Sequence, residues 1–197
     1  MGCNGDSFAR VGPQSREFPG CLSSVREGRR GRRLGAPHER LRGPRHRGGT
    51  VQPADLEQYI RRHIPLSRAM AVSVVAAGSD AVALQAPLAP NINHRQTAFG
   101  GSEAALAILA SWALLHVRLQ ADGIADHLVI QRNSMEYRRP VLGEFSARAV
   151  LAHPERWQQF LTMLASKGRA RVTVSTVLEC AGETAGTFTG DFVAFAA

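Results

Sequence analysis

Residues 91–102 read Asn91-Ile-Asn-His-Arg-Gln-Thr-Ala-Phe-Gly-Gly-Ser102 and lead directly into an apolar segment from Glu103 to Leu115. The sequence from Ala104 to Leu119 is apolar around almost the whole circumference of a helix, which a surface helix would not be. It therefore predicts a helix in the middle of the fold. The first turn of such a helix presents unpaired backbone N–H groups and a positive dipole end, which suit a carbonyl oxygen, an enolate or a phosphate. We expect a catalytic or binding site at this helix start.

The segments on either side of this helix carry the pattern of half-buried strands. The clearest case is the run from Ala170 to Cys180, where apolar residues such as Val174 and Leu178 share one side. Half-buried alternation implies an antiparallel sheet with one wet side. Strands are predicted at 69–77, 81–88, 127–138, 144–152, 170–180 and 184–195. We expect the first two to pair, and the third and fourth to form a hairpin joined by Pro140-Val-Leu-Gly143.

Two further helices are predicted at 54–64 and 154–166, each with apolar residues at helical spacing on one side. One long buried helix wrapped by an antiparallel sheet is the arrangement called a hot-dog. The predicted fold class is therefore α+β, with a single hot-dog domain over residues 51–197. A segment of this length matches a typical single domain and can enclose a core.

Residues 1–50 differ sharply in composition from the rest of the chain. Their first 49 positions hold eleven arginines against four acidic residues, and so carry +7 of the formal net charge of +8. Gly, Pro and Arg fill about half of these positions, and the apolar residues follow no strand or helix period. Such a segment cannot bury enough surface to offset its chain entropy. We expect residues 1–50 to be a disordered leader.

Three interpretations of this leader are open. The arginines between Arg29 and Arg47 suit phosphate contacts with nucleic acid, but no aromatic residues lie among them for base stacking, so nucleic acid is not the expected partner. The paired arginines resemble an export signal, but no apolar region follows them. The favoured interpretation is a solvated tail, or a mis-assigned translation start with Val51 as the true initiator.

The composition also argues against metal sites and membrane spans. The three cysteines and the isolated histidines show no ligand spacing, so no metal and no cofactor is expected. The apolar run from Ala104 to Leu115 is twelve residues long, shorter than the roughly 18 needed to cross a bilayer. We expect a soluble, cytoplasmic protein with no membrane partner.

The residues also resemble a known family. The motif Asn91-x-Asn-x-x-x-Thr-Ala-Phe-Gly-Gly-Ser102, followed by an Ala- and Leu-rich helix ending in Trp112, resembles the YiiD C-terminal family of hot-dog proteins. The resemblance covers about residues 54–196, including the Tyr137–Gly143 connection and the helix that opens Pro154-Glu-Arg-Trp157. Members are described as thioesterases, and some resemble enzymes that decarboxylate malonyl-acyl-carrier protein to acetyl-acyl-carrier protein, a primer for fatty-acid synthesis. The resemblance implies an enzyme acting on acyl thioesters of acyl-carrier protein or coenzyme A.

Two reactions of a thioester make different demands on such a site. Hydrolysis needs a general base or a nucleophile together with an oxyanion site, and hot-dog thioesterases often carry a carboxylate about two turns into the central helix. Here that position reads Ala107-Ile-Leu-Ala-Ser-Trp112, without Asp or Glu. Decarboxylation needs no base, but the enolate oxygen must be stabilised. The sequence therefore favours decarboxylation, while Glu103 or a water held by Asn93 leaves hydrolysis open.

The expected catalytic residues are Asn93, Gly101 and Ser102. The Asn93 carboxamide and the N–H groups of Gly100, Gly101 and Ser102 would hold the thioester oxygen. Phe99 and Trp112 would form an apolar wall that penalises the malonyl carboxylate. The complete set of expected substrate-binding residues is Asn91, His94, Thr97, Phe99, Gly100, Trp112, Arg138 and Arg139.

Several of these residues have structural alternatives. Asn91 and Asn93 are common turn residues, Ser102 and Glu103 suit helix capping, and Trp112 suits the core. Arg138 and Arg139 suit the phosphates of coenzyme A or the acidic face of a carrier protein, although arginine pairs at strand ends are often only solvated. Lone hot-dogs expose sheet edges that usually pair, so we expect a homodimer with a pocket lined by both chains. A hot-dog that binds an acyl group without turnover is the alternative to an enzyme.

Overall fold

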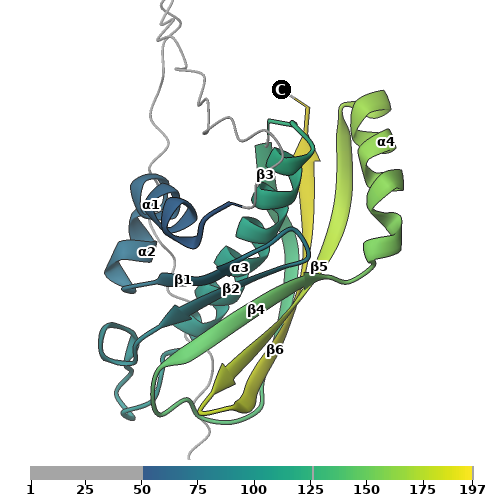
Figure 1. The fold of residues 1–197 in the computed structure, drawn as a ribbon. Helices are drawn as coiled ribbons and strands as arrows, with labels where there is room; N and C mark the ends of the chain where they lie inside the picture. Colours follow the sequence, from purple (N-terminus) through teal and green to yellow (C-terminus); the bar gives the residue numbers. More distant parts are fainter. Residues whose placement is uncertain (1–50, 126, 197) are drawn as a thin grey trace, which may run out of the picture. The chain divides into compact units, whose positions relative to one another are not determined.

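The structure is a computed structural model that describes residues 51–125 and 127–196. The predicted leader, residues 1–50, lies outside the described residues. The described part of the chain is an α+β domain (Figure 1). Its elements are α1 (Pro53–His63), α2 (Pro65–Ala69), β1 (Ser73–Ala77), β2 (Ala81–Ala86), η1 (Ala89–Asn91), α3 (Gly100–Ala121), β3 (His127–Tyr137), β4 (Phe145–Leu151), η2 (Pro154–Arg156), α4 (Trp157–Lys167), β5 (Arg169–Cys180) and β6 (Glu183–Phe195).

The strands of the described region form one six-stranded antiparallel sheet in the order β1-β2-β4-β5-β6-β3. The predicted pairing of the first two strands is confirmed, but β1 begins at Ser73 because Pro65–Ala69 form a short helix instead. Pro65 thus ends one helix and opens the next, a position that proline's fixed φ favours.

The predicted hairpin between the third and fourth strands is wrong. β3 pairs with β6 at one edge of the sheet, whereas β4 lies between β2 and β5. The connection between β3 and β4 is anchored instead of turning back on itself, because Val141 is fully buried and its carbonyl oxygen accepts the N–H of Ala98 at 2.9 Å. This crossing carries the chain past the start of α3.

α3 is the central helix that the sequence predicts, and it contacts β2, β3, β4, β5 and β6. Leu106, Ala110 and Leu114 are fully buried on it. With the antiparallel sheet around it, the helix confirms the predicted hot-dog arrangement. By length and composition, α3 is the one helix of the described residues that could cross a membrane, with 22 residues and a mean hydropathy of 1.4, but 61% of that window is buried inside the protein. Such burial fits a core helix.

The two faces of the sheet differ as the alternation predicts. Phe188 and Phe192 on β6 are buried, while Thr189 and Asp191 between them point to the other side. The helix is also joined to the sheet by a buried polar contact, since the Ser111 and Thr176 hydroxyl oxygens lie 2.8 Å apart. This pairing satisfies two hydroxyl groups that would otherwise be costly to bury.

The predicted helix at 154–166 is confirmed as η2 and α4, which packs along β5 (Figure 1). Trp157, Phe160 and Leu164 form its buried face. The Trp157 indole N–H donates to Asp122 at 2.9 Å, and the Arg118 guanidinium lies 4.6 Å from the centre of the Trp157 ring. These contacts hold α4 against the carboxyl end of α3.

Candidate active site

The loop that precedes α3 is closed by the side chain of Asn91. This residue is buried, and its amide nitrogen donates to the carbonyl oxygens of Met70 at 3.0 Å and Pro87 at 2.8 Å. The backbone carbonyl oxygen of Asn91 accepts the N–H of Phe99 at 2.7 Å. Asn91 thus joins both ends of the loop to the preceding chain, as its turn-forming alternative requires. Its side-chain oxygen is buried without a hydrogen-bond partner among the described residues, and the predicted contact with substrate stays a prediction.

The side chain of Asn93 stabilises the same loop through hydrogen bonds to residues within it. Its amide nitrogen donates to the Thr97 hydroxyl at 2.9 Å and to the Ala98 carbonyl at 3.0 Å. Its side-chain oxygen accepts the N–H groups of Arg95 at 2.8 Å and Thr97 at 3.3 Å. Both amide hydrogens are therefore engaged, and the Asn93 carboxamide has none left for a thioester oxygen in this geometry. His94 lies exposed at the loop tip.

The start of α3 offers two backbone donors rather than the predicted three. The N–H groups of Ser102 and Glu103 both donate to the Phe99 carbonyl oxygen, at 2.8 and 3.1 Å. Within the described residues, the N–H groups of Gly100 and Gly101 have no acceptor. Ser102 thus uses its N–H to close the first turn, and the available pair belongs to the two glycines.

Two exposed aromatic rings lie against this glycine pair. A Cβ atom on Gly101 would come within 2.2 Å of the Phe99 ring, and one on Gly100 within 3.3 Å of the Tyr137 ring. The Tyr137 hydroxyl also donates to the Gly100 carbonyl oxygen at 2.9 Å. Phe99 is 58% exposed and Tyr137 54% exposed. The absence of side chains on the glycines lets both rings lie directly against the glycine backbone that carries the free N–H groups.

Glu103 is the residue for which the sequence suggested helix capping or a part in hydrolysis. Its side chain is only 5% exposed, and its Oε2 atom is buried without a hydrogen-bond partner among the described residues. Burial raises the pKa of this carboxyl from its ordinary value of 4.5 to about 7. The signal in the sequence was its spacing, since Glu103 lies three, four and seven residues before the buried Leu106, Ala107 and Ala110.

Tyr137 is electrostatically linked to Glu103. Burial raises the pKa of the Tyr137 hydroxyl, and the nearby Glu103 carboxylate raises it further. Because the same hydroxyl bonds the Gly100 carbonyl oxygen, the carboxyl group, the phenol and the glycine pair lie together at one end of α3. The sequence analysis placed Tyr137 only in the connection after β3, without a role.

Trp112 lies away from this cluster. It is partly buried and stacks on His116 at 4.9 Å between ring centres and on Tyr59 of α1 at 6.3 Å. Eleven residues of helix separate it from Gly101, which is about 16 Å along the axis. The expected apolar wall of Phe99 and Trp112 is therefore not formed, and Trp112 takes the structural role of joining α1 to α3. Tyr137 occupies the place beside Phe99.

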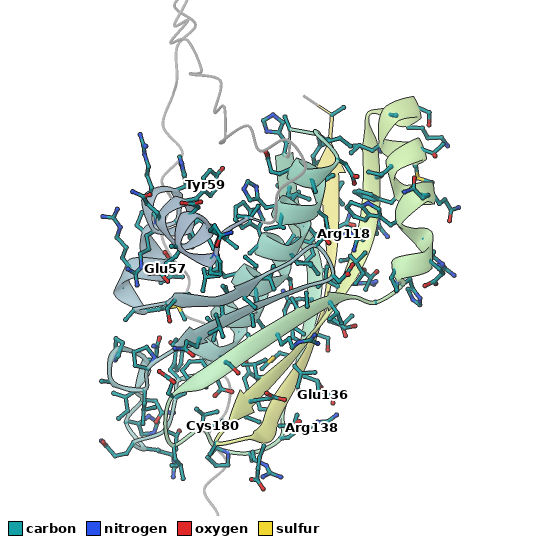
Figure 2. The ribbon with its side chains drawn as sticks, viewed as in Figure 1. Glu57, Tyr59, Arg118, Glu136, Arg138 and Cys180 are labelled. Carbon is teal, nitrogen blue, oxygen red and sulfur yellow. The ribbon has the colours of Figure 1, made fainter. Side chains whose placement is uncertain are left out.

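The predicted basic pair follows Tyr137 and so lies near the start of α3. Arg138 is within 3.6 Å of Glu136 (Figure 2). Arg139 pairs with Glu183. Both side chains are about half exposed. Their backbone N–H groups donate to the Ala185 carbonyl oxygen, which fixes where the chain leaves β3. A phosphate or carboxylate partner would therefore compete with surface ion pairs that contribute little to stability.

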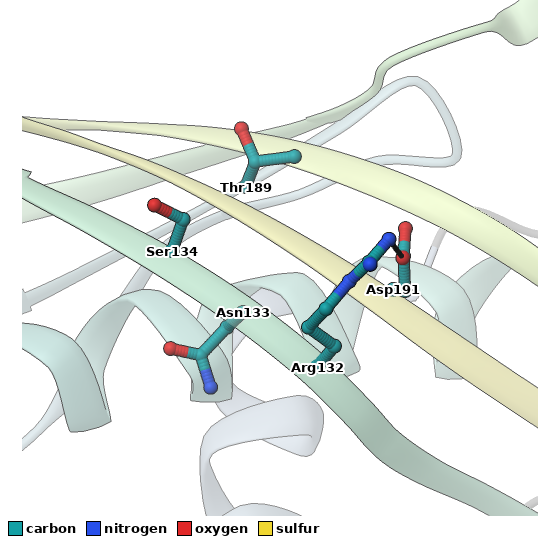
Figure 3. A pocket seen from close by; sticks show the side chains of 5 residues that line it. All are labelled: Arg132, Asn133, Ser134, Thr189 and Asp191. Atoms are coloured by element: carbon teal, nitrogen blue, oxygen red, sulfur yellow. Dashed lines mark hydrogen bonds and ion pairs between the residues drawn. The ribbon is translucent and has the colours of Figure 1, made fainter.

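A pocket of about 260 Å³ lies on the face of the sheet that is turned away from α3 (Figure 3). It is lined by Arg132, Asn133, Ser134, Thr189 and Asp191. Asp191 accepts hydrogen bonds from the Thr173 hydroxyl at 2.8 Å and from the Arg132 guanidinium at 2.7 Å, and these bonds lower its pKa.

The described residues contain no group of three or more His, Cys, Asp or Glu that could hold a metal ion. The start of α3 brings together backbone N–H groups, a phenol and one buried carboxyl.

The sequence of the described domain matches a known protein family. Residues 53–196 match the family described as "Putative thioesterase (yiiD_Cterm)". This chain belongs to that family. The match runs from α1 to the end of β6, and it confirms the resemblance read from the motif before α3.

Solved structures extend the likeness. A protein of unknown function from Chlorobaculum tepidum is 27% identical, with a TM-score of 0.70, and the match covers 75% of this chain and 99% of that one. A putative thioesterase from Shewanella oneidensis is 24% identical, with a TM-score of 0.62 and coverage of 73% and 96%. A protein from Pseudomonas aeruginosa described as a probable thioesterase is 21% identical, with a TM-score of 0.63 and coverage of 76% and 100%. The latter two share the fold, and the family match places this chain in the thioesterase superfamily of hot-dog proteins.

Proposed function

We propose that this protein removes carbon dioxide from a malonyl thioester at the start of α3 and leaves the acetyl thioester. The observation that carries the proposal is the pair of N–H groups on Gly100 and Gly101, which have no acceptor within the described residues. They lie beside the exposed rings of Phe99 and Tyr137. Two such N–H groups at a helix start bind an oxygen on which negative charge develops.

The proposed reaction uses the groups as follows. When the bond between the malonyl carboxylate and the α-carbon breaks, its electron pair passes into the thioester and forms an enolate. The N–H groups of Gly100 and Gly101 stabilise the enolate oxygen, and an oxyanion donor of this kind is worth about 10² to 10³ in rate. The rings of Phe99 and Tyr137 solvate the malonyl carboxylate less well than water does, which favours its loss. Asn93 holds the loop that leads to the donors and takes no direct part.

Hydrolysis of an acyl thioester is the second candidate, and the Glu103 carboxyl is the observation that favours it. With a pKa of about 7, this group is ionised above neutral pH and is then able to act as a general base toward water. The structural neighbour from Shewanella oneidensis is described as a "putative thioesterase" and the one from Pseudomonas aeruginosa as a "Probable Thioesterase". Burial weighs against this reaction at neutral pH, because with a pKa of about 7 roughly half of the Glu103 carboxyl is protonated there and cannot act as a base.

The acyl group is proposed to arrive on acyl-carrier protein or coenzyme A, with acetyl-carrier protein serving to start fatty-acid synthesis. Arg138 and Arg139 support this partner class, because they are half exposed and follow directly after Tyr137. We also propose a homodimer formed through β3, an edge strand on which Val129 and Tyr137 are exposed. Light scattering on the purified protein tests the dimer. The cytoplasmic location expected from the sequence stays a prediction.

The first experiment identifies the product. The full chain is incubated with malonyl-acyl-carrier protein, and in parallel with malonyl-coenzyme A, and the masses of the thioesters are measured. Acetyl thioester is the expected product. Free thiol would instead establish hydrolysis, and unchanged substrate would favour longer acyl groups or an acyl-binding module without turnover.

A matched pair of variants tests the donor. Gly100→Pro removes one N–H group at the first position of α3, where proline is tolerated, and the preceding Phe99 already has the extended backbone that proline requires, with φ −71° and ψ 127°. Gly100→Ala adds the same Cβ beside Tyr137 but keeps the N–H group. We expect the proline variant to lose about 10² to 10³ in rate while the alanine variant stays within a few-fold of the unmodified protein. Equal rates in both variants would remove the proposed role of this N–H group.

A further inference from the structure

The start of α3 holds a carboxyl group for which the fold gives no partner. Glu103 Oε2 is buried and unpaired among the described residues, although a buried polar atom without a hydrogen bond costs about 1 to 3 kcal/mol. The other buried titratable side chain in the described region is His116, thirteen residues further along the helix and so about 20 Å away. Glu103 is therefore the one buried acid at the end of the helix where Gly100 and Gly101 present their N–H groups.

We propose that the Glu103 carboxyl, in its protonated form, supplies the proton that converts the enolate of the decarboxylation into the acetyl thioester. This inference rests on the proposed function. The enolate α-carbon forms a C–H bond with the carboxyl hydrogen, the O–H electron pair stays on Glu103 as a carboxylate, and water restores the proton. One malonyl thioester and one proton thus give one acetyl thioester and one carbon dioxide, with no oxidant, reductant or metal.

The neighbouring side chains leave Glu103 as the donor. The Tyr137 hydroxyl already donates its hydrogen to the Gly100 carbonyl oxygen at 2.9 Å. The amide hydrogens of Asn93 are taken by Thr97 and Ala98. The unpaired Glu103 oxygen has neither commitment, and Glu103 is three residues from Gly100, in the first turn of the same helix.

The electrostatic surroundings keep this carboxyl protonated near neutrality. Removal from water raises its pKa to about 7, even though the positive end of α3 favours a negative charge. The titratable group that responds to its charge is Tyr137 on β3. Arg138 and Arg139, beyond Tyr137, are paired with Glu136 and Glu183. The remaining buried polar residues of the described elements are the uncharged Ser67, Asn91, Ser111 and Thr176.

The protonated form is lost as the pH rises through about 7. The decarboxylation rate at saturating substrate should therefore be high at pH 6 and at least tenfold lower by pH 9. A general base would give the opposite slope, because the ionised carboxyl would then be the active form. The direction of the pH profile thus separates a proton donor from a hydrolytic base.

The experiment measures acetyl-carrier protein formed from malonyl-acyl-carrier protein by the full chain between pH 5.5 and 9, for the unmodified protein, Glu103→Gln and Glu144→Gln. The glutamine at position 103 keeps the shape and the neutral charge but has no proton to give. We expect its kcat at pH 6 to fall about 10²-fold, with KM within about threefold and with a flat pH profile. Glu144→Gln makes the same chemical change at an exposed position away from the start of α3, so its variant should keep the unmodified profile.

Each other outcome overturns the proposal. Glu103→Gln with an unmodified kcat, or with the same pH profile, would assign the proton to water or to another group. An unmodified protein whose rate rises between pH 6 and 9 would overturn it without any variant, so the test does not depend on how well the variant folds. Decarboxylation that is unaffected by Glu103→Gln would leave the proposed function standing, whereas no acetyl product from the unmodified protein would remove both.

Discussion

The substitution Glu103→Gln also has a consequence for stability that involves no substrate. The pKa of this carboxyl is about 7 in the folded protein, against an ordinary value of 4.5 in an unfolded chain. Because the folded state holds this proton more tightly, the contribution of Glu103 to stability is greatest below pH 4.5 and is lost as the pH rises through about 7. This difference between the folded and unfolded pKa values corresponds to about 3 kcal/mol in the free energy of unfolding, at about 1.36 kcal/mol for each pKa unit. Glutamine stays neutral throughout, so the variant escapes this loss.

Thermal denaturation of the full chain between pH 4 and pH 8.5 measures the effect. Relative to the unmodified protein, the Tm of Glu103→Gln should rise by about 6 to 12 °C between the two ends of this range, since about 2 to 4 °C accompanies each kcal/mol in a domain of this size. Glu144→Gln removes an exposed carboxyl and serves as the control. A Tm difference that stays constant with pH would refute the reasoning, because Glu103 would then ionise as easily in the folded protein as in the unfolded one.

Three further substitutions test the contacts around the helix. Asn93→Ala removes the loop hydrogen bonds and should cost about 1 to 3 kcal/mol; lost turnover with an unchanged Tm would instead favour the predicted contact with substrate. Ser111→Ala leaves the buried Thr176 hydroxyl without its partner and should also cost about 1 to 3 kcal/mol, which urea denaturation measures, and adding Thr176→Val should recover much of that loss. Trp157→Phe removes the bond to Asp122 and should lower stability by about 1 to 2 kcal/mol in the same assay; no loss in the Trp157 variant would contradict the role given to this bond.

Periodicity was sufficient to predict most of the elements. The stretch from Ala104 to Leu119 was predicted as the central helix because nearly every position is apolar, and the structure extends it to Gly100–Ala121. The pairing of β3 could not be predicted in this way. Alternation assigns a face to each residue but says nothing about which strand lies beside which. The short connection through Val141 has the length of a hairpin loop, and only the structure shows that Val141 is buried and bonded to Ala98.

The candidate site shows a similar division. The sequence located the glycine pair because a Gly-Gly turn before an apolar helix has a local physical meaning. It did not reveal that the Asn93 amide and the Ser102 N–H are consumed inside the loop, since both contacts depend on the folded path of residues 91–103. Trp112 was grouped with Phe99 by residue type alone, whereas its stacking on Tyr59 and His116 places it toward α1.

The short segment from Phe99 to Glu103 runs against what folding alone favours. It exposes a phenyl ring, begins a helix with two glycines of low helix propensity, and buries a carboxyl oxygen without a partner. A leucine at position 103 would fill similar space without the roughly 3 kcal/mol that ionisation costs above pH 7. All three features lie within one turn of the free N–H pair, and local departures from folding rules that gather in this way are typical of functional sites. We therefore expect Glu103→Leu to be more stable than the unmodified protein at pH 8 in thermal denaturation, and a less stable variant would show that the carboxyl serves the fold after all.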